Sequence, residues 1–61
     1  MHVRIEVHCQ ERPRVKEIRE LLRLDGNWKA VFTDGKGNVM GFPSQKRRPR
    51  EGEVMTFVLE E

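Results

Sequence analysis

The chain has 61 residues, a length near the lower limit for one domain that builds its core without disulfides or metals. Apolar and charged residues each make up 36% of it, so we expect a thin core beneath a heavily charged surface. The single cysteine, Cys9, excludes an intramolecular disulfide, and no apolar run is long enough for a signal peptide or a membrane span. These features predict a soluble, cytoplasmic protein in which residues 1–61 form a single domain.

The charges are distributed unevenly along the chain. All 12 Lys and Arg residues lie within residues 1–50 together with six acidic residues, whereas residues 51–61 hold four glutamates and no base. The net charge of +2 is therefore the sum of a basic body and an acidic end. Such a body favours an anionic partner over an acidic or apolar one.

Residues 1–9 predict a β-strand with one buried face, because apolar and polar residues alternate along them. One side of this strand consists of Val3, Ile5, Val7 and Cys9, and the other of His2, Arg4, Glu6 and His8.

The next segment predicts an amphipathic helix. Pro13 fits its first turn, where a missing N–H costs nothing, and Gly26 supplies the left-handed residue that commonly ends a helix. The apolar stripe, at spacings of three and four residues, consists of Val15, Ile18, Leu21 and Leu22. No Ser, Thr, Asp or Asn precedes Pro13, so the side-chain N-cap is weak.

From residue 27 onward the pattern returns to a period of two and predicts three more strands. A turn at residues 34–38, rich in glycine and Asx, joins the first to a short return strand that ends at Phe42, and residues 53–60 form the last. The residues expected to face inward are Trp28, Ala30, Phe32, Met55, Phe57 and Leu59. The predicted fold is α+β, in β-α-β-β-β order, with one helix packed on one face of a mostly antiparallel four-stranded sheet.

Two groups of cations are candidates for binding phosphate. Four lie on one stripe of the predicted helix without an intervening acid, namely Arg12, Lys16, Arg19 and Arg23. Four more fall in a loop that Pro43 and Pro49 stiffen, namely Lys46, Arg47, Arg48 and Arg50. Each group alone is also typical of a solvated surface, but the two together favour a nucleic acid, whose phosphates present a matching row of charge.

The aromatic residues indicate how a nucleic acid would be held. Trp28, Phe32, Phe42 and Phe57 fall on or near the apolar pattern of the predicted core, and tyrosine is absent. Since binders of single strands normally expose rings on which bases stack, we expect contacts with the nucleic-acid backbone instead. Trp28, at the start of its strand, is the one exception to this expectation.

The polar side of the first strand carries groups that acid–base catalysis uses, in His2, Arg4, Glu6 and His8. Alternate residues on one strand form a line, whereas catalytic groups converge from several elements, so we predict no enzyme and keep a small nuclease as a third alternative. His2, His8 and Cys9 have no fourth ligand at metal spacing, so neither a metal site nor a cofactor is predicted.

Residues 26–46, GNWKAVFTDGKGNVMGFPSQK, resemble the hairpin of the arm-type DNA-binding domain in phage integrases. In that family a tryptophan strand, an Asp/Gly turn and a Phe-Pro-Ser/Thr-x-Lys stretch recur, and the resemblance implies a sheet that enters the major groove. The family continues into a helix after that lysine, whereas this chain continues into the basic residues 47–50. It also opens with a strand and a helix that the family does not need, so we do not assign it to that family.

The leading hypothesis is a small non-enzymatic module that binds DNA or RNA through its phosphates. Its role would be accessory or regulatory, since phosphate contacts carry little sequence information. The alternative is a protein-binding regulator, such as an inhibitor, an antitoxin-like partner or a subunit of a larger assembly. That regulator would bind a protein partner, or a second copy of the chain, on the sheet face that the helix leaves uncovered, at Val31, Val54, Thr56 and Val58.

Overall fold

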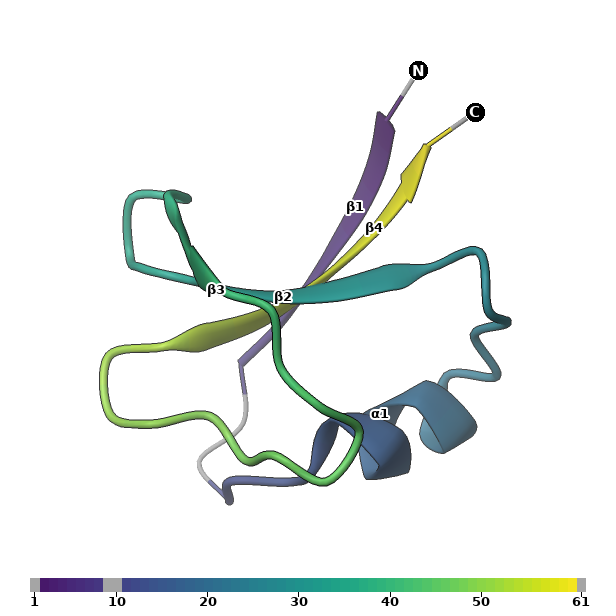
Figure 1. The fold of residues 1–61 in the computed structure, drawn as a ribbon, viewed down its shortest axis with the longest axis horizontal. Coiled ribbons are helices and arrows are strands. Elements are labelled where there is room, and N and C mark those ends of the chain that lie inside the picture. The colour runs from purple at the N-terminus through teal and green to yellow at the C-terminus, as the bar shows by residue number, and fades with distance from the viewer. Residues whose placement is uncertain (1, 9–10, 61) are drawn as a thin grey trace.

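A computed structural model describes residues 2–8 and 11–60 (Figure 1). Its elements are β1 (His2–Val7), α1 (Val15–Leu21), β2 (Lys29–Thr33), β3 (Val39–Gly41) and β4 (Val54–Glu60). The strands form one antiparallel sheet in the order β1-β4-β2-β3, so β4 lies between β1 and β2. The predicted α+β class and order of elements are confirmed. The predictions for Met1, for Cys9 and for the side chain of His2 lie outside the described residues.

The core lies between α1 and one face of the sheet. Strand β4 supplies the centre of that face, because Met55 and Phe57 pair with β1 on one side and with β2 on the other. The buried cluster consists of Val15, Ile18, Phe32, Met55 and Phe57, with Ile5, Val7, Leu24, Trp28 and Ala30 packed partly buried against it. The strand residues of this cluster and the first two positions of the helical stripe therefore fall where the sequence pattern predicts. Val3, predicted on the buried side of the first strand, is 40% exposed.

The helix is shorter than predicted at its start. It begins at Val15, with Arg14 as the N-cap, so Pro13 lies before the first turn. Leu21 and Leu22, both predicted to be buried, are 74% and 43% exposed, and Leu22 lies just past the last residue of the helix. Seen down the axis, Leu21 lies about 120° from Val15, which turns it away from the sheet in a helix of only seven residues.

The end of the helix also differs from the prediction, which assigned it to Gly26. The residue in the left-handed conformation is Arg23, with a φ of 54°. The amides of Arg23 and Leu24 donate to the carbonyls of Glu20 (3.2 Å) and Arg19 (2.9 Å), which are the two bonds of a Schellman motif. This motif turns the chain back toward β2, and Leu24 packs against the core.

The sheet face that the helix leaves uncovered is largely closed. The four residues considered for a protein partner are Val31 (7% exposed), Thr56 (0%) and the half-buried Val54 and Val58. The expectation of an exposed face is therefore wrong for Val31 and Thr56. The guanidinium of Arg4 on β1 reaches over β4 and donates to the carbonyl of Gly37 in the β2–β3 turn (3.5 Å), so the sheet curls toward this face.

The turn between β2 and β3 confirms the predicted hairpin. One carboxylate oxygen of Asp34 accepts hydrogen bonds from the amides of Lys36 (2.7 Å) and Asn38 (3.0 Å), and Gly37 has a φ of 86°. The hydrogen bonds from Asn38, followed by the one from Lys36, hold the pKa of Asp34 below its ordinary value.

Candidate nucleic-acid interface

The loop of residues 45–50 is attached to the start of α1 through the backbone. The amides of Val15 and Lys16, the first two of the helix, donate to the carbonyls of Arg47 (3.1 Å) and Gln45 (2.9 Å). A helix start leaves its first amides without partners inside the helix, and here the loop supplies them in place of a capping side chain. Two segments that are thirty residues apart in sequence thus form one unit.

A second pair of contacts joins the same two segments, between the residue before Pro13 and the end of the loop. Arg12 donates from Nε to the carbonyl of Pro49 (2.6 Å), and Arg48 donates from Nη1 to the carbonyl of Arg12 (2.5 Å). Each arginine therefore anchors the other segment while its side chain stays exposed. These contacts bring the two predicted groups of cations together.

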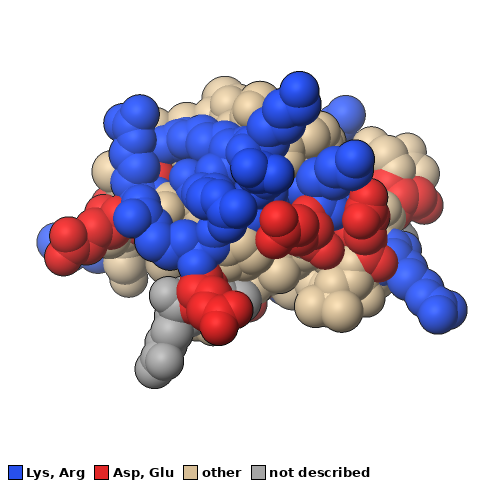
Figure 2. Space-filling view, turned by 90° about the horizontal axis from the view of Figure 1, so that it is seen from below, with Lys and Arg blue, Asp and Glu red and all other residues tan. Residues whose placement is uncertain are grey.

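The resulting face is strongly basic. Figure 2 views the molecule from the side of α1 and the loop, and Lys and Arg side chains gather at its middle with acidic side chains around them. We define the basic surface as Arg12, Lys16, Lys46, Arg48 and Arg50, all of which are exposed. Within residues 2–8 and 11–60, the side chains of Lys16, Lys46 and Arg50 make no hydrogen bond or ion pair.

Arg47, predicted to bind phosphate, instead points into the fold. Its Nη2 lies 2.9 and 2.8 Å from the two carboxylate oxygens of Glu53, whose side chain is only 7% exposed. Its guanidinium also lies over the ring of Phe32, 4.3 Å from the ring centroid. The charge of Arg47 is therefore neutralised within the fold, and the side chain packs between the loop and the core.

Arg19 is likewise engaged within the fold. Its guanidinium donates to the backbone carbonyls of Trp28 (2.8 Å) and Asp25 (3.1 Å) and to the side chain of Gln45 (3.3 Å). It also lies 5.4 Å from the ring centroid of Phe57. Arg19 therefore ties α1 to the segment before β2 and to the loop, and it contributes charge to this face without a free guanidinium.

The two other basic residues of this region differ from the prediction in opposite ways. Arg23 is exposed but lies beyond the end of α1, so it no longer continues the helical stripe. Arg14, which the stripe did not include, is exposed at the N-cap beside the loop contacts. The weak N-cap could have indicated that Arg14 belongs to this surface. The first amides of the helix need acceptors from another segment, and that segment must lie beside the N-cap residue.

Phe42 corrects the interpretation of the aromatic residues. The sequence pattern predicts it in or near the core, but it is 82% exposed. Strand β3 ends at Gly41, which pairs with Phe32, and Pro43 then prevents further pairing, so Phe42 lies outside the sheet. Trp28, by contrast, is half-buried and packs against the core.

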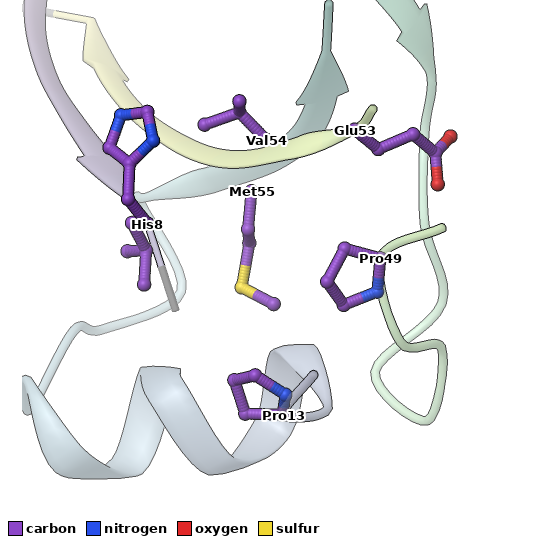
Figure 3. A pocket seen from close by; sticks show the side chains of 7 residues that line it. His8, Pro13, Pro49, Glu53, Val54 and Met55 are labelled. Atoms are coloured by element: carbon purple, nitrogen blue, oxygen red, sulfur yellow. The ribbon is translucent and has the colours of Figure 1, made fainter. Parts of the chain in front are cut away.

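A hollow of about 270 Å³ lies on the other side of the loop, between the end of β1 and the start of β4 (Figure 3). In Figure 3 the side chain of Met55 points into it between Pro13 and Pro49, whereas Glu53 and His8 point away from each other. The hollow is thus apolar inside, and its two titratable groups do not converge as a catalytic pair would.

The polar residues on and just after β1 converge only as one exposed pair. His8 lies 3.3 Å from the carboxylate of Glu6, and both side chains are exposed. Arg4 is directed to the β2–β3 turn. In the described part of the chain, no group of three His, Cys, Asp or Glu residues is placed to hold a metal ion.

Comparison with known proteins identifies no relative, since no family model, curated protein or solved structure matches the chain. Over residues 2–8 and 11–60, no helix has the length and apolar character needed to cross a membrane.

Proposed function

We propose that the chain is a small nucleic-acid-binding module that holds phosphates on its basic surface. The observation behind this proposal is the docking of the 45–50 loop on the start of α1, which joins two separate groups of cations into one face. Like charges repel, so exposed Lys and Arg side chains held close together favour an anionic ligand that neutralises them.

The rigidity of this surface supports the same proposal. Its loop is held by four contacts to residues 12–16 and is stiffened by Pro49, so little conformational entropy is lost when a ligand binds. Lysine side chains on such a surface contact phosphates as point charges, and arginine side chains contact them as planar hydrogen-bond donors. Contacts of this kind hold the polymer without reading its bases, which fits an accessory or regulatory role.

The proposal is tested by measuring affinity for labelled DNA and RNA across a salt series, using fluorescence anisotropy. The logarithm of the binding constant should fall linearly with the logarithm of the salt concentration. Removing Lys16, Lys46 and Arg50 together, as Lys16→Gln, Lys46→Gln and Arg50→Gln, should reduce the slope by about two units, since each phosphate contact contributes about 0.7–0.9.

The matched control is Lys36→Gln, which removes one exposed positive charge from the β2–β3 turn instead. It should leave the slope unchanged, whereas Lys46→Gln alone should reduce it by a little under one unit. Absence of binding at low salt, or an equal effect of Lys36→Gln and Lys46→Gln, would count against the proposed surface.

The alternative of a protein-binding regulator has no comparable observation behind it. Its basis was an exposed β-branched face, and two of the four residues, Val31 and Thr56, are buried by the curled sheet. The nucleic-acid proposal is therefore the one that the geometry favours.

A further inference from the structure

Phe42 is the most exposed large hydrophobic side chain in the described part of the chain, at 82%. Single exposed apolar residues are ordinary on protein surfaces, so exposure alone indicates nothing. The surroundings of Phe42 are more informative, because it borders an open hollow of about 560 Å³ on the face between the 45–50 loop and β2.

The hollow combines aromatic and basic groups. Its lining includes Phe42 and Pro43 after β3, Trp28 and Lys29 just before and at the start of β2, and Arg19 and Gln45 from α1 and the loop. Its lining includes no acidic residue. An aromatic side chain next to positive charge is the combination that binds a flat, electron-rich ring attached to a phosphate.

The hollow is continuous with the basic surface. Gln45 lines it from the loop, and its backbone carbonyl accepts a hydrogen bond from the amide of Lys16. Gln45 also directly precedes Lys46. Lys46 follows Phe42 by four residues, so their Cα atoms lie at most about 14 Å apart. A strand whose phosphates contact Lys46 can therefore extend a neighbouring base to Phe42.

We propose that Phe42 is a stacking platform for an unpaired nucleobase, which makes single-stranded nucleic acid the preferred ligand of this module. This inference rests on the proposed function, since it assigns the ligand class of the same surface. Bases in a duplex already stack on one another and cannot offer a face to a protein ring, whereas bases in a single strand can. DNA and RNA share this chemistry, so both are expected to bind.

The test compares an oligothymidylate and an oligouridylate of about 12 nucleotides with a duplex of the same length, by anisotropy at one low salt concentration. The single strands should bind more tightly than the duplex. Phe42→Ala should weaken single-strand binding by about 5- to 150-fold, the range that base–aromatic stacking gives, and should leave duplex binding unchanged. Phe42→Trp should restore single-strand binding.

Two further measurements keep this result specific. Leu21→Ala removes another highly exposed apolar side chain, which lies about 140° round the helix from Lys16, and it should not change binding of either form. Trp28, the only tryptophan, lines the hollow, so its fluorescence should change when a single strand binds and stay constant when a duplex binds.

The two proposals fail in different ways. If no nucleic acid binds at low salt, the proposed function is wrong and the stacking platform with it. If single strand and duplex bind equally and Phe42→Ala binds like the unmodified chain, the phosphate surface stands and the platform is overturned. A loss of duplex and single-strand binding together in Phe42→Ala, with the fold intact by circular dichroism, would also overturn it.

Discussion

Replacing Arg47 with methionine should destabilise the fold, although the residue lies in a loop of four cations. Methionine keeps a flexible apolar stem over the ring of Phe32 but removes the guanidinium that pairs with Glu53. The matched substitution is Arg48→Met, one residue along, whose exposed side chain makes one hydrogen bond, to the carbonyl of Arg12. The two changes are identical in chemistry and differ only in what the arginine contacts.

The size of the effect follows from the burial of the pair. Removing one partner of a fully buried ion pair costs about 3–5 kcal/mol, because the other charge is left without compensation. Glu53 is 7% exposed and Arg47 is 27% exposed, so solvent reaches one partner and we expect about 2–3 kcal/mol. The lost cation–π contact adds about 1 kcal/mol. A chain of 61 residues has only about 3–9 kcal/mol of stability, so Arg47→Met should remove a large part of it.

Urea unfolding, followed by the fluorescence of Trp28, measures this change. Arg48→Met should lower the free energy of unfolding by no more than about 1 kcal/mol, because it removes only one exposed hydrogen bond, to the carbonyl of Arg12. Combining Arg47→Met with Glu53→Gln should recover part of the loss, because the double variant leaves no carboxylate unpaired. Equal stability of Arg47→Met and the unmodified chain, with a reduced salt slope for nucleic acid, would show that Arg47 contacts phosphate and would refute this reasoning.

Two more predictions concern the turns. Arg23→Gly should raise the free energy of unfolding by about 0.5–1 kcal/mol, because glycine adopts the left-handed conformation without the steric cost that arginine incurs. The melting temperature should rise accordingly. An unchanged or lower melting temperature would contradict strain at Arg23. The pKa of Asp34 is lowered in the fold, so its contribution is present above the ordinary carboxyl value near pH 4 and is lost as the pH falls through the folded pKa. Asp34→Asn should therefore flatten the acid side of a melting-temperature profile, whereas a profile identical to that of the unmodified chain would contradict a stabilising charge.

The order and type of the elements could be predicted because each depends on a local period. The alternation through Ile5 and Val7, and again through Met55 and Phe57, requires only that one sheet face be buried. Val31 and Thr56 differ from the prediction in mid-strand, because the second face of the sheet is buried there as well. Other failures lie at the end of an element or just beyond it. Leu21 stands at the last position of α1 and Phe42 just beyond β3, and neither end is marked by the period itself.

The candidate site was less predictable because it depends on contacts between distant segments. The sequence does not distinguish Arg47, which pairs with Glu53 and covers Phe32, from Arg48, whose exposed side chain bonds only a backbone carbonyl. The strand order likewise follows from the whole core and not from any local motif. The weak N-cap before Val15 was the one local sign that another segment must complete the helix start.

The central claim is that one face, made of α1 and the 45–50 loop, holds the nucleic acid. It is tested most directly by a two-dimensional amide NMR titration of the isotope-labelled chain with an oligothymidylate of about 12 nucleotides at low salt. Shift changes should be concentrated at residues 12–16 and 42–50 and reversed by added salt, and the 34–38 turn should be unaffected. Changes centred on the 34–38 turn, or no changes at all, would contradict this claim.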